Sequence, residues 1–302
     1  MSGQGGDAAK SASDLERECG LEREPLQRID IGGLHFHYAE AGQGLPLVFV
    51  HGVLGDWRTW APQWPAFTPH FRALSYSRRY SVPNGNSQPS PQHSALVEAE
   101  DLAALLDAWQ ARPAVLVGSS YGAFTALALA VARPGLVRAM VLLEPPMLRW
   151  ADFSEEGRAV RAAFDRDVRL PARAAFERGD DATGVQLLTG GIVGAASAAR
   201  QPTAAMQRRL ENALSLRMLT LSTDEFPLIE PHAVRRLRMP VALMAGADTP
   251  AIHDVVFRNL CAQMPQAEVS RIPDAGHGAA RDNPVVFNRL ALDFLRRHDL
   301  CG

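Results

Sequence analysis

A serine between two glycines is the residue of this chain with the clearest potential for chemistry. The segment runs Val115-Leu-Val-Gly-Ser-Ser-Tyr-Gly122, so Ser120 is the centre of a G-x-S-x-G motif. An apolar, strand-forming run precedes it, and a helix-forming run follows it at Ala123-Phe-Thr-Ala-Leu-Ala-Leu-Ala130. Glycines permit the sharp strand-to-helix turn that exposes a serine hydroxyl. The motif in this context predicts a nucleophilic serine rather than a turn without chemistry.

A nucleophilic serine needs a base, and one histidine stands in a suitable place. A serine hydroxyl is a weak nucleophile until a neighbouring base takes its proton. Among the nine histidines, His277 lies in the glycine-flanked stretch Ala275-Gly-His-Gly278, between a predicted strand and a predicted helix. A ring in that loop can reach over the turn that carries Ser120. We therefore predict that His277 is the base.

The elements that must position these residues are strands and helices in alternation. The first two predicted strands flank Gly32-Gly33 and indicate an antiparallel hairpin. Later strands are continuous apolar runs, typical of a parallel sheet buried on both faces. The predicted strands are Leu26–Ile31, Leu34–Ala39, Leu45–Val50, Phe71–Tyr76, Ala114–Val117, Arg138–Leu143, Val241–Ala245 and Glu268–Ile272. The predicted helices are residues 94–110, residues 121–132, Ile252–Met264 and Pro284–Arg297.

Two stretches fall outside this alternation. Residues 1–24 are rich in glycine, serine and charge, and predict a loose tail with a short helix at Ser13–Glu18. Residues 147–232 predict helices rich in alanine and arginine, with no strands between them. Within that stretch, Gly190-Gly191 and Gly194 predict a bend or a mobile segment.

Composition and charge exclude several classes of function. The 302 residues are 47% hydrophobic and 21% charged, and the net charge of −2 offers no electrostatic footprint for nucleic acid or an anionic membrane. The first ten residues lack the apolar core of a secretory signal, and no apolar run is long enough to span a bilayer. The odd number of widely spaced cysteines (Cys19, Cys261 and Cys301) argues against a disulfide framework. We expect a cytoplasmic protein.

Four motifs in chain order give the sequence a resemblance to a known family. His51-Gly52 follows a predicted strand, Ser120 follows a later one, a helical insertion comes after the sixth strand, and Gly276-His277-Gly278 lies near the end. Over roughly residues 26–298 the chain resembles an α/β-hydrolase. The resemblance implies an α/β-hydrolase core formed by residues 25–146 and 233–302. Residues 147–232 would be a helical cap above the carboxyl ends of the strands.

The resemblance also implies roles for further residues. The backbone amides of Val53 and Tyr121 would form the oxyanion hole, and His51 and Gly52, in the adjoining loop, would contribute to substrate binding. Trp57 follows that loop and is expected to wall the substrate pocket.

The acid that orients His277 has two candidates. Relatives often place an aspartate three residues after the glycine that ends the seventh strand, but here Thr249 occupies that place and Asp248 precedes it. Glu144 instead ends the sixth strand, just before Pro145-Pro146, at the carboxyl edge of the sheet. Some α/β-hydrolases carry their acid at this strand end. We slightly prefer Glu144 as this acid, and Asp248 remains the alternative.

Other polar groups have structural interpretations. Arg78-Arg79 either binds a substrate carboxylate or braces a loop, and bracing is the preferred interpretation. Asp248, His253 and Asp254 resemble a metal cluster in composition, but an enzyme of this type needs no metal. We expect no cofactor and no metal.

The expected function is hydrolysis of a small to medium, largely apolar carboxylic ester. Ser120 would form an acyl-enzyme that water then hydrolyses. Cleavage of a carbon–carbon bond in a ring-fission product, lactone or amide hydrolysis, and perhydrolase activity are alternatives on the same residues. A receptor that only binds its small ligand is a further alternative. A serine nucleophile argues against epoxide hydrolase and haloalkane dehalogenase activity, which need a carboxylate. The oligomeric state is not predicted.

Overall fold

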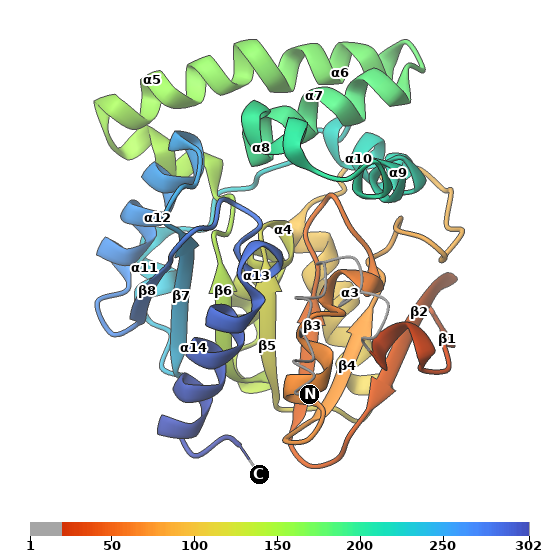
Figure 1. The fold of residues 1–302 in the computed structure, drawn as a ribbon, viewed down its shortest axis with the longest axis vertical. Helices are drawn as coiled ribbons and strands as arrows, with labels where there is room; N and C mark the ends of the chain where they lie inside the picture. Colours follow the sequence, from red (N-terminus) through yellow and green to blue (C-terminus); the bar gives the residue numbers. More distant parts are fainter. Residues whose placement is uncertain (1–19, 302) are drawn as a thin grey trace, which may run out of the picture.

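An eight-stranded sheet forms the centre of the protein in a computed structural model, which describes residues 20–301 (Figure 1). The strands lie side by side in the order β1-β2-β4-β3-β5-β6-β7-β8. Their bounds are β1 Gln27–Ile31, β2 Leu34–Ala41, β3 Pro46–Val50, β4 Arg72–Tyr76, β5 Ala114–Ser119, β6 Val137–Leu143, β7 Val241–Gly246 and β8 Glu268–Ile272.

The pairing of the strands decides where the site can form. β1 and β2 form the predicted antiparallel hairpin, β2 pairs antiparallel with β4, and every later pairing is parallel. The carboxyl ends of β3, β5, β6 and β7 therefore meet at one edge of the sheet, where ligands bind in folds of this kind. The predicted α/β-hydrolase fold with its mostly parallel sheet is confirmed.

Helices cover both faces of the sheet because its parallel strands are apolar on both sides. In β3, Val48 and Val50 join one buried cluster, while Leu47 and Phe49 join another on the opposite face. The first cluster packs against α3 (Ala95–Ala108), α4 (Tyr121–Ala132), α11 (Pro231–Arg235) and α12 (Ala251–Gln263). The second packs against η1 (Gly20–Arg23), η2 (Trp57–Trp60), α2 (Trp64–Phe67), α13 (Ala279–Asp282) and α14 (Pro284–Arg297). A short 3-10 turn, η3 (Pro134–Leu136), leads from α4 into β6.

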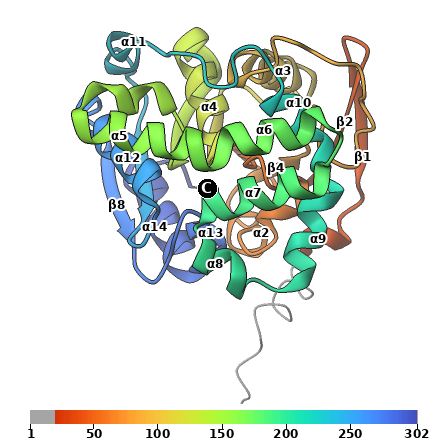
Figure 2. The same ribbon diagram turned by 90° about the horizontal axis from the view of Figure 1, so that it is seen from above.

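A helical insertion, residues 147–232, separates β6 from β7 and lies across one edge of the sheet (Figures 1 and 2). A long run made of α5, the π-helical η5 and α6 crosses the top of the molecule, with α7 beside it. The helices of the insertion are η4 Leu148–Phe153, α5 Glu155–Phe164, η5 Asp165–Arg169, α6 Leu170–Glu177, α7 Asp181–Val193, α8 Ala195–Arg200, α9 Thr203–Glu211 and α10 Ala213–Thr220.

The predicted bend at Gly190-Gly191 is wrong. Both glycines lie inside α7, and a Cβ at Gly191 would overlap the side chain of Val168, so this glycine permits close helix packing. The break comes at Gly194, which has a φ of 85° and separates α7 from α8. The predicted helix at Ser13–Glu18 lies outside the described residues. Among residues 20–301, no helix is both long enough and apolar enough to cross a membrane.

Candidate active site

Ser120 lies in the sharp turn between β5 and α4. Its backbone has φ 53° and ψ −123°, and a positive φ is uncommon for residues other than glycine. The flanking glycines are required sterically. A Cβ at Gly118 would lie 2.6 Å from the Cα of Ala123, and one at Gly122 would overlap the carbonyl oxygen of Val50. The G-x-S-x-G motif is therefore the sequence that this turn demands.

A hydrogen-bonded chain connects Ser120, His277 and Glu144. His277 Nε2 lies 2.9 Å from Ser120 Oγ, and His277 Nδ1 lies 2.6 Å from Glu144 Oε2. The exposed fractions are only 9%, 6% and 2% for Ser120, His277 and Glu144. Because a carboxylate only accepts hydrogen bonds, Nδ1 carries the proton, and Nε2 of the neutral ring accepts from the serine hydroxyl. This arrangement orients His277 to take the proton of Ser120.

The structure brings Glu144, and not Asp248, to His277. Glu144 Oε1 accepts a hydrogen bond of 2.8 Å from the amide of Gly246, and Oε2 accepts one of 2.6 Å from Thr249 Oγ1. Asp248 is exposed, and its amide donates to the carbonyl of Ala275, so its backbone belongs to the loop that supports His277. The alternative that Asp248 contacts His277 is therefore wrong in this geometry. Thr249, at the position where relatives place an aspartate, binds the carboxylate that comes from β6.

The loop after β3 packs against the serine turn. His51 is fully buried, with Nδ1 donating to the carbonyl of Gly52 at 2.8 Å and Nε2 accepting from the amide of Arg78 at 3.0 Å. Burial, and then the nearby Arg78 guanidinium, lower the pKa of His51 to about 3, so the ring is neutral. A Cβ at Gly52 would lie 3.1 Å from the Cβ of Ser120. His51 thus fixes the loop, while Gly52 allows its close approach to Ser120, and neither residue lines the cavity at Ser120 as the predicted substrate-binding role requires.

Two backbone amides adjoin Ser120 from different elements. Val53 follows this loop and Tyr121 begins α4, and both line one cavity together with Ser120. Across residues 20–301, neither amide donates a hydrogen bond to another group of the chain. The amide of Tyr121 also lies at the positive end of the α4 dipole. Both amides are free to bind negative charge.

The cavity above Ser120 is narrow and mostly apolar. Its volume is about 30 Å³, enough for about one or two water molecules. Its walls come from the sheet edge and from the helical insertion, which contributes Leu148, Phe164, Leu188, Ile192, Leu216, Leu219 and Phe226 among others. A substrate larger than a few atoms requires these helices to shift.

Comparison with known proteins identifies the family. A family profile described as the alpha/beta hydrolase fold matches residues 46–284. The chain belongs to the α/β-hydrolase family. Over 277 residues it is 28% identical to a candidate non-heme bromoperoxidase, BpoC, of Mycobacterium tuberculosis, covering 86% of this chain and 97% of that protein. It is 24% identical to 2-(acetamidomethylene)succinate hydrolase of Mesorhizobium japonicum, covering 93% and 99%. The enol-lactonase of Burkholderia xenovorans has a similar structure, with a TM-score of 0.71 at 18% identity, covering 89% and 100%.

A second histidine of this α/β-hydrolase lies against His277. The rings of His253 and His277 stack with their centroids 3.6 Å apart and an angle of 17° between their planes. His253 Nε2 donates to the carbonyl of Ile192 at 3.0 Å, and Nδ1 has no hydrogen-bond partner within residues 20–301. Burial, and next the charge of His277 when protonated, lower the pKa of His253 well below its usual value. Sequence reasoning missed its place in the site. Its spacing from Val256 and Leu260 on one helix face was the available signal.

The side chains of Glu144, His253 and His277 also form a group with metal-ligating atoms. One such atom from each lies within 4.8 Å of the others. However, hydrogen bonds to Glu144 and Ser120 occupy both nitrogens of His277. The group could bind a metal only by giving up those contacts. Asp248 and Asp254 do not belong to this group.

Trp57 and the arginine pair lie outside the cavity. Trp57 packs against the buried cluster on the α14 face of the sheet and is not among the cavity-lining residues, so its predicted role as a pocket wall is wrong. Its carbonyl accepts from Ser75 Oγ at 2.7 Å, which ties this residue to β4. Arg78 Nη1 pairs with the buried Glu98 at 2.5 Å, and Arg79 pairs with Asp101 at 2.6 Å. The prediction that this pair braces its loop is confirmed.

The ion pair between Arg78 and Glu98 contacts α4, the helix that follows the serine turn. Glu98 also accepts from Thr125 Oγ1 at 3.2 Å, and the Arg78 guanidinium lies 5.3 Å from the ring centre of Tyr121. Although burial favours the neutral acid, Arg78 and His93 lower the pKa of Glu98 to about 2. A charged, fully buried network thus joins the loop after β4 to α3 and α4.

Proposed function

We propose that this α/β-hydrolase cleaves carboxylic esters with Ser120 as nucleophile, His277 as base and Glu144 as the acid that orients His277. The observation that carries the proposal is the unbroken, buried hydrogen-bonded chain from Ser120 Oγ to the Glu144 carboxylate. The two unpaired amides beside the serine hydroxyl support it, because acyl transfer places negative charge on the carbonyl oxygen.

The first half of the reaction forms an acyl-enzyme. Ser120 Oγ bonds to the ester carbonyl carbon while His277 Nε2 takes the serine proton, and the carbonyl electron pair moves to its oxygen. The amides of Val53 and Tyr121 hold that oxyanion. Collapse of the intermediate breaks the bond to the alcohol, which leaves with the proton of His277. Glu144 stabilises the positive ring between these two transfers.

The second half returns the free enzyme. Water attacks the acyl carbon, and His277 takes its proton through Nε2. The new oxyanion occupies the same two amides. Collapse breaks the bond to Ser120 Oγ, which recovers its proton from His277, and the carboxylic acid leaves.

The substrate is proposed to have a small or medium, largely apolar acyl part. The residues around the serine cavity are mostly aliphatic or aromatic. We propose the helical insertion, residues 147–232, as the cap over a core formed by residues 25–146 and 233–302, because several of its helices contribute cavity walls. Lactones fall within this proposal as cyclic esters. Similarity to an enol-lactonase and to a hydrolase of a succinate derivative supports an acyl substrate of this size.

Turnover of p-nitrophenyl butyrate tests the proposal. We expect saturable hydrolysis with a burst of p-nitrophenol, and loss of activity by about 10⁴-fold or more in Ser120→Ala. Ser119→Ala is the matched control, because Ser119 is the adjacent residue at the end of β5 and, within residues 20–301, its side chain has no hydrogen bond to His277 or Glu144. Equal activity of the two variants, or no turnover of any short-chain ester by the folded protein, would contradict the proposal.

A further inference from the structure

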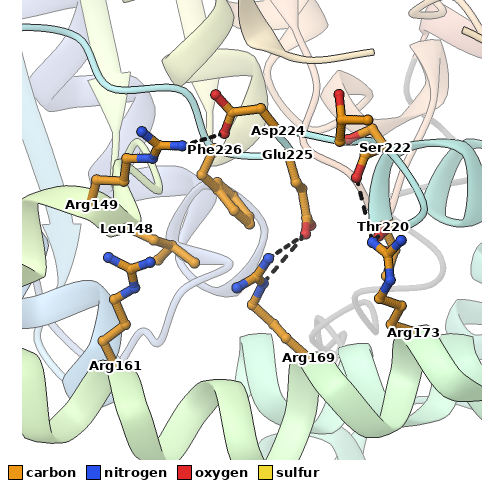
Figure 3. A pocket seen from close by; sticks show the side chains of 11 residues that line it. Leu148, Arg149, Arg161, Arg169, Arg173, Thr220, Ser222, Asp224, Glu225 and Phe226 are labelled. Atoms are coloured by element: carbon orange, nitrogen blue, oxygen red, sulfur yellow. Dashed lines mark hydrogen bonds and ion pairs between the residues drawn. The ribbon is translucent and has the colours of Figure 1, made fainter. Parts of the chain in front are cut away.

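A second cavity adjoins the serine cavity and has a very different lining (Figure 3). Its volume is about 210 Å³, and all of its lining residues belong to the helical insertion. Five residues line both cavities, so the two share a wall: Leu148, Arg169, Thr220, Glu225 and Phe226. A ligand that reaches Ser120 past this wall therefore has its far end in or beside the second cavity.

Arginines dominate the second cavity. Arg161 in α5, Arg169 in η5 and Arg173 in α6 project from one face of the long helical run, as Figure 3 shows. Their spacing of eight and four residues keeps them on that face. Arg149 in η4 faces them from another wall. Only two carboxylates, Asp224 and Glu225, are among the lining residues.

Arg169 and Glu225 form the charged part of the shared wall. Arg169 Nη2 lies 2.9 Å from Glu225 Oε2, and Arg169 Nη1 lies 2.6 Å from Asp165. Glu225 is buried, and its carbonyl accepts from the Tyr121 hydroxyl at 2.7 Å. All three guanidinium nitrogens of Arg169 are therefore paired within the helical insertion, and the pair marks where the apolar cavity ends and the arginine-lined one begins.

Arg161 and Arg173 have their acidic partners elsewhere. Arg161 pairs with Asp152 and, at 3.6 Å, with Asp165. Arg173 pairs with Glu177 at 3.0 Å and donates to the carbonyls of Thr220 and Ser222 at 2.8 and 3.4 Å. None of these three acids is among the lining residues, so the guanidinium groups of Arg161 and Arg173 face the cavity without a carboxylate of the lining as their partner. Arg149 does have such a partner in Asp224, but both side chains are nearly half exposed, at 45% and 46%. An exposed pair of this kind is weak and is easily exchanged for a ligand.

We propose that this arginine-lined cavity binds a carboxylate group of the substrate, so that the ester cleaved at Ser120 is itself an anion. The inference rests on the proposed ester hydrolysis and sharpens it: an apolar segment fills the serine cavity, and a carboxylate at its far end contacts Arg161 and Arg173. The planar guanidinium matches a carboxylate through two parallel hydrogen bonds, which an ammonium group does not offer. The apolar lining beside Ser120 and the charged lining beyond it fit one molecule with two such ends.

Two matched esters test the proposal. Mono-p-nitrophenyl adipate and p-nitrophenyl hexanoate have the same chain length and differ in the terminal carboxylate. We expect wild type to prefer the adipate ester. Arg161→Gln and Arg173→Gln should each lower the ratio of kcat/KM for the adipate ester to that for the hexanoate ester by about tenfold, mainly through KM.

Arg166→Gln is the matched control on the same helical run. Arg166 is 70% exposed, pairs with Asp167 and does not line the cavity, so its ratio should stay within about twofold of wild type. Because Arg173 also donates to the carbonyl of Thr220, Arg161→Gln is the variant with the smaller structural cost. If the ratio of kcat/KM for the two esters is the same in Arg161→Gln, Arg173→Gln and Arg166→Gln, the proposal is overturned. The arginines would then serve only to stabilise the helices through their ion pairs.

Binding separates this proposal from the proposed ester hydrolysis. Calorimetry with adipate on the Ser120→Ala protein should detect a single site that weakens about tenfold in the added Arg161→Gln variant. That result supports the cavity even if neither ester is hydrolysed. Absence of adipate binding overturns it. With active enzyme, free adipate should compete with mono-p-nitrophenyl adipate, whereas acceleration of hexanoate ester hydrolysis would indicate a separate effector site and overturn the proposal.

Discussion

The sheet edge and the helical insertion hold their side chains by different means. At the sheet edge, the backbone fixes positions: Gly118 and Gly122 leave no room for a Cβ, and the amide of Gly246 holds Glu144. In the helical insertion, long side chains hold one another, as Arg169 and Glu225 do. Backbone sterics allow one arrangement, whereas ion pairs and aliphatic contacts allow several. We infer that the edge determines the reaction and the insertion determines the substrate.

The largest effect is expected from the acid at the sheet edge. Glu144→Gln keeps the shape but removes the negative charge that stabilises the protonated ring of His277, and its amide NH2 favours the wrong tautomer when it faces Nδ1, so kcat should fall by about 10³- to 10⁴-fold. Asp248→Asn is the control, since that carboxylate is exposed, and should change kcat by about twofold or less. Steady-state kinetics on p-nitrophenyl butyrate measure both. A large effect at Asp248 and a small one at Glu144 would reverse our assignment of the acid.

The second test concerns the sterics of the serine turn. Gly122→Ala places a Cβ against the Val50 carbonyl, so the turn must distort, and we expect a loss of about 3 kcal/mol in the free energy of unfolding. Gly135→Ala is the control, because nothing lies within 4 Å of its added Cβ. It should change stability by about 0.5 kcal/mol or less. Urea unfolding of both variants gives the comparison, and equal stabilities would show that the turn is not sterically fixed.

The difference between backbone sterics and side-chain packing also explains which parts of the fold and the site could be predicted from the sequence. The strands could be predicted from the spacing of their apolar residues, and the hairpin from the position of its two glycines. The observed sheet confirms the predicted fold class. The predictions for Ser120 and His277 rest on glycine-rich turns, which constrain local structure, and the structure brings the two side chains within hydrogen-bonding distance. Glu144 and Asp248 could not be separated by sequence, because the loop after β7 decides which carboxylate reaches the histidine. Trp57 was misplaced and His253 overlooked, since both depend on packing between segments distant in sequence.

A third test uses His51, the neutral histidine in the loop after β3. The folded pKa of His51 is about 3, below the unfolded value of about 6.5. Unfolding therefore takes up a proton below about pH 6.5, and the stability contributed by neutral His51 is full above that pH and lost as pH falls toward about 3. Between about pH 6.5 and 5 this loss should reach about 2 kcal/mol.

His51→Gln removes that titration. The variant starts less stable but should lose about 2 kcal/mol less than wild type over the same pH interval in urea unfolding. His253→Gln provides a parallel measurement, because burial also lowers the pKa of His253. An identical pH dependence in wild type and His51→Gln would mean that the pKa of His51 is the same in the folded and unfolded protein.

The smallest effect is expected in the helical insertion, on preference rather than on the reaction. Leu216 in α10 lines the serine cavity, so Leu216→Ala should enlarge it and raise the hexanoate-to-acetate ratio of kcat/KM by about fivefold to tenfold. Leu237→Ala removes an equally buried leucine that does not line the cavity. Both should lose about 2–5 kcal/mol of stability. If Leu237→Ala changes the hexanoate-to-acetate ratio by the same factor, the effect of Leu216→Ala would come from lower overall stability rather than from a larger cavity.

Covalent labelling of the serine is the most direct test of the account. The folded protein would be treated with a fluorophosphonate and the adduct located by peptide mass spectrometry. We predict a single adduct on Ser120, absent in Ser120→Ala, retained in Ser119→Ala and formed much more slowly in His277→Ala. No adduct on the folded protein, or an adduct on another residue, would contradict the claim that Ser120 is the nucleophile.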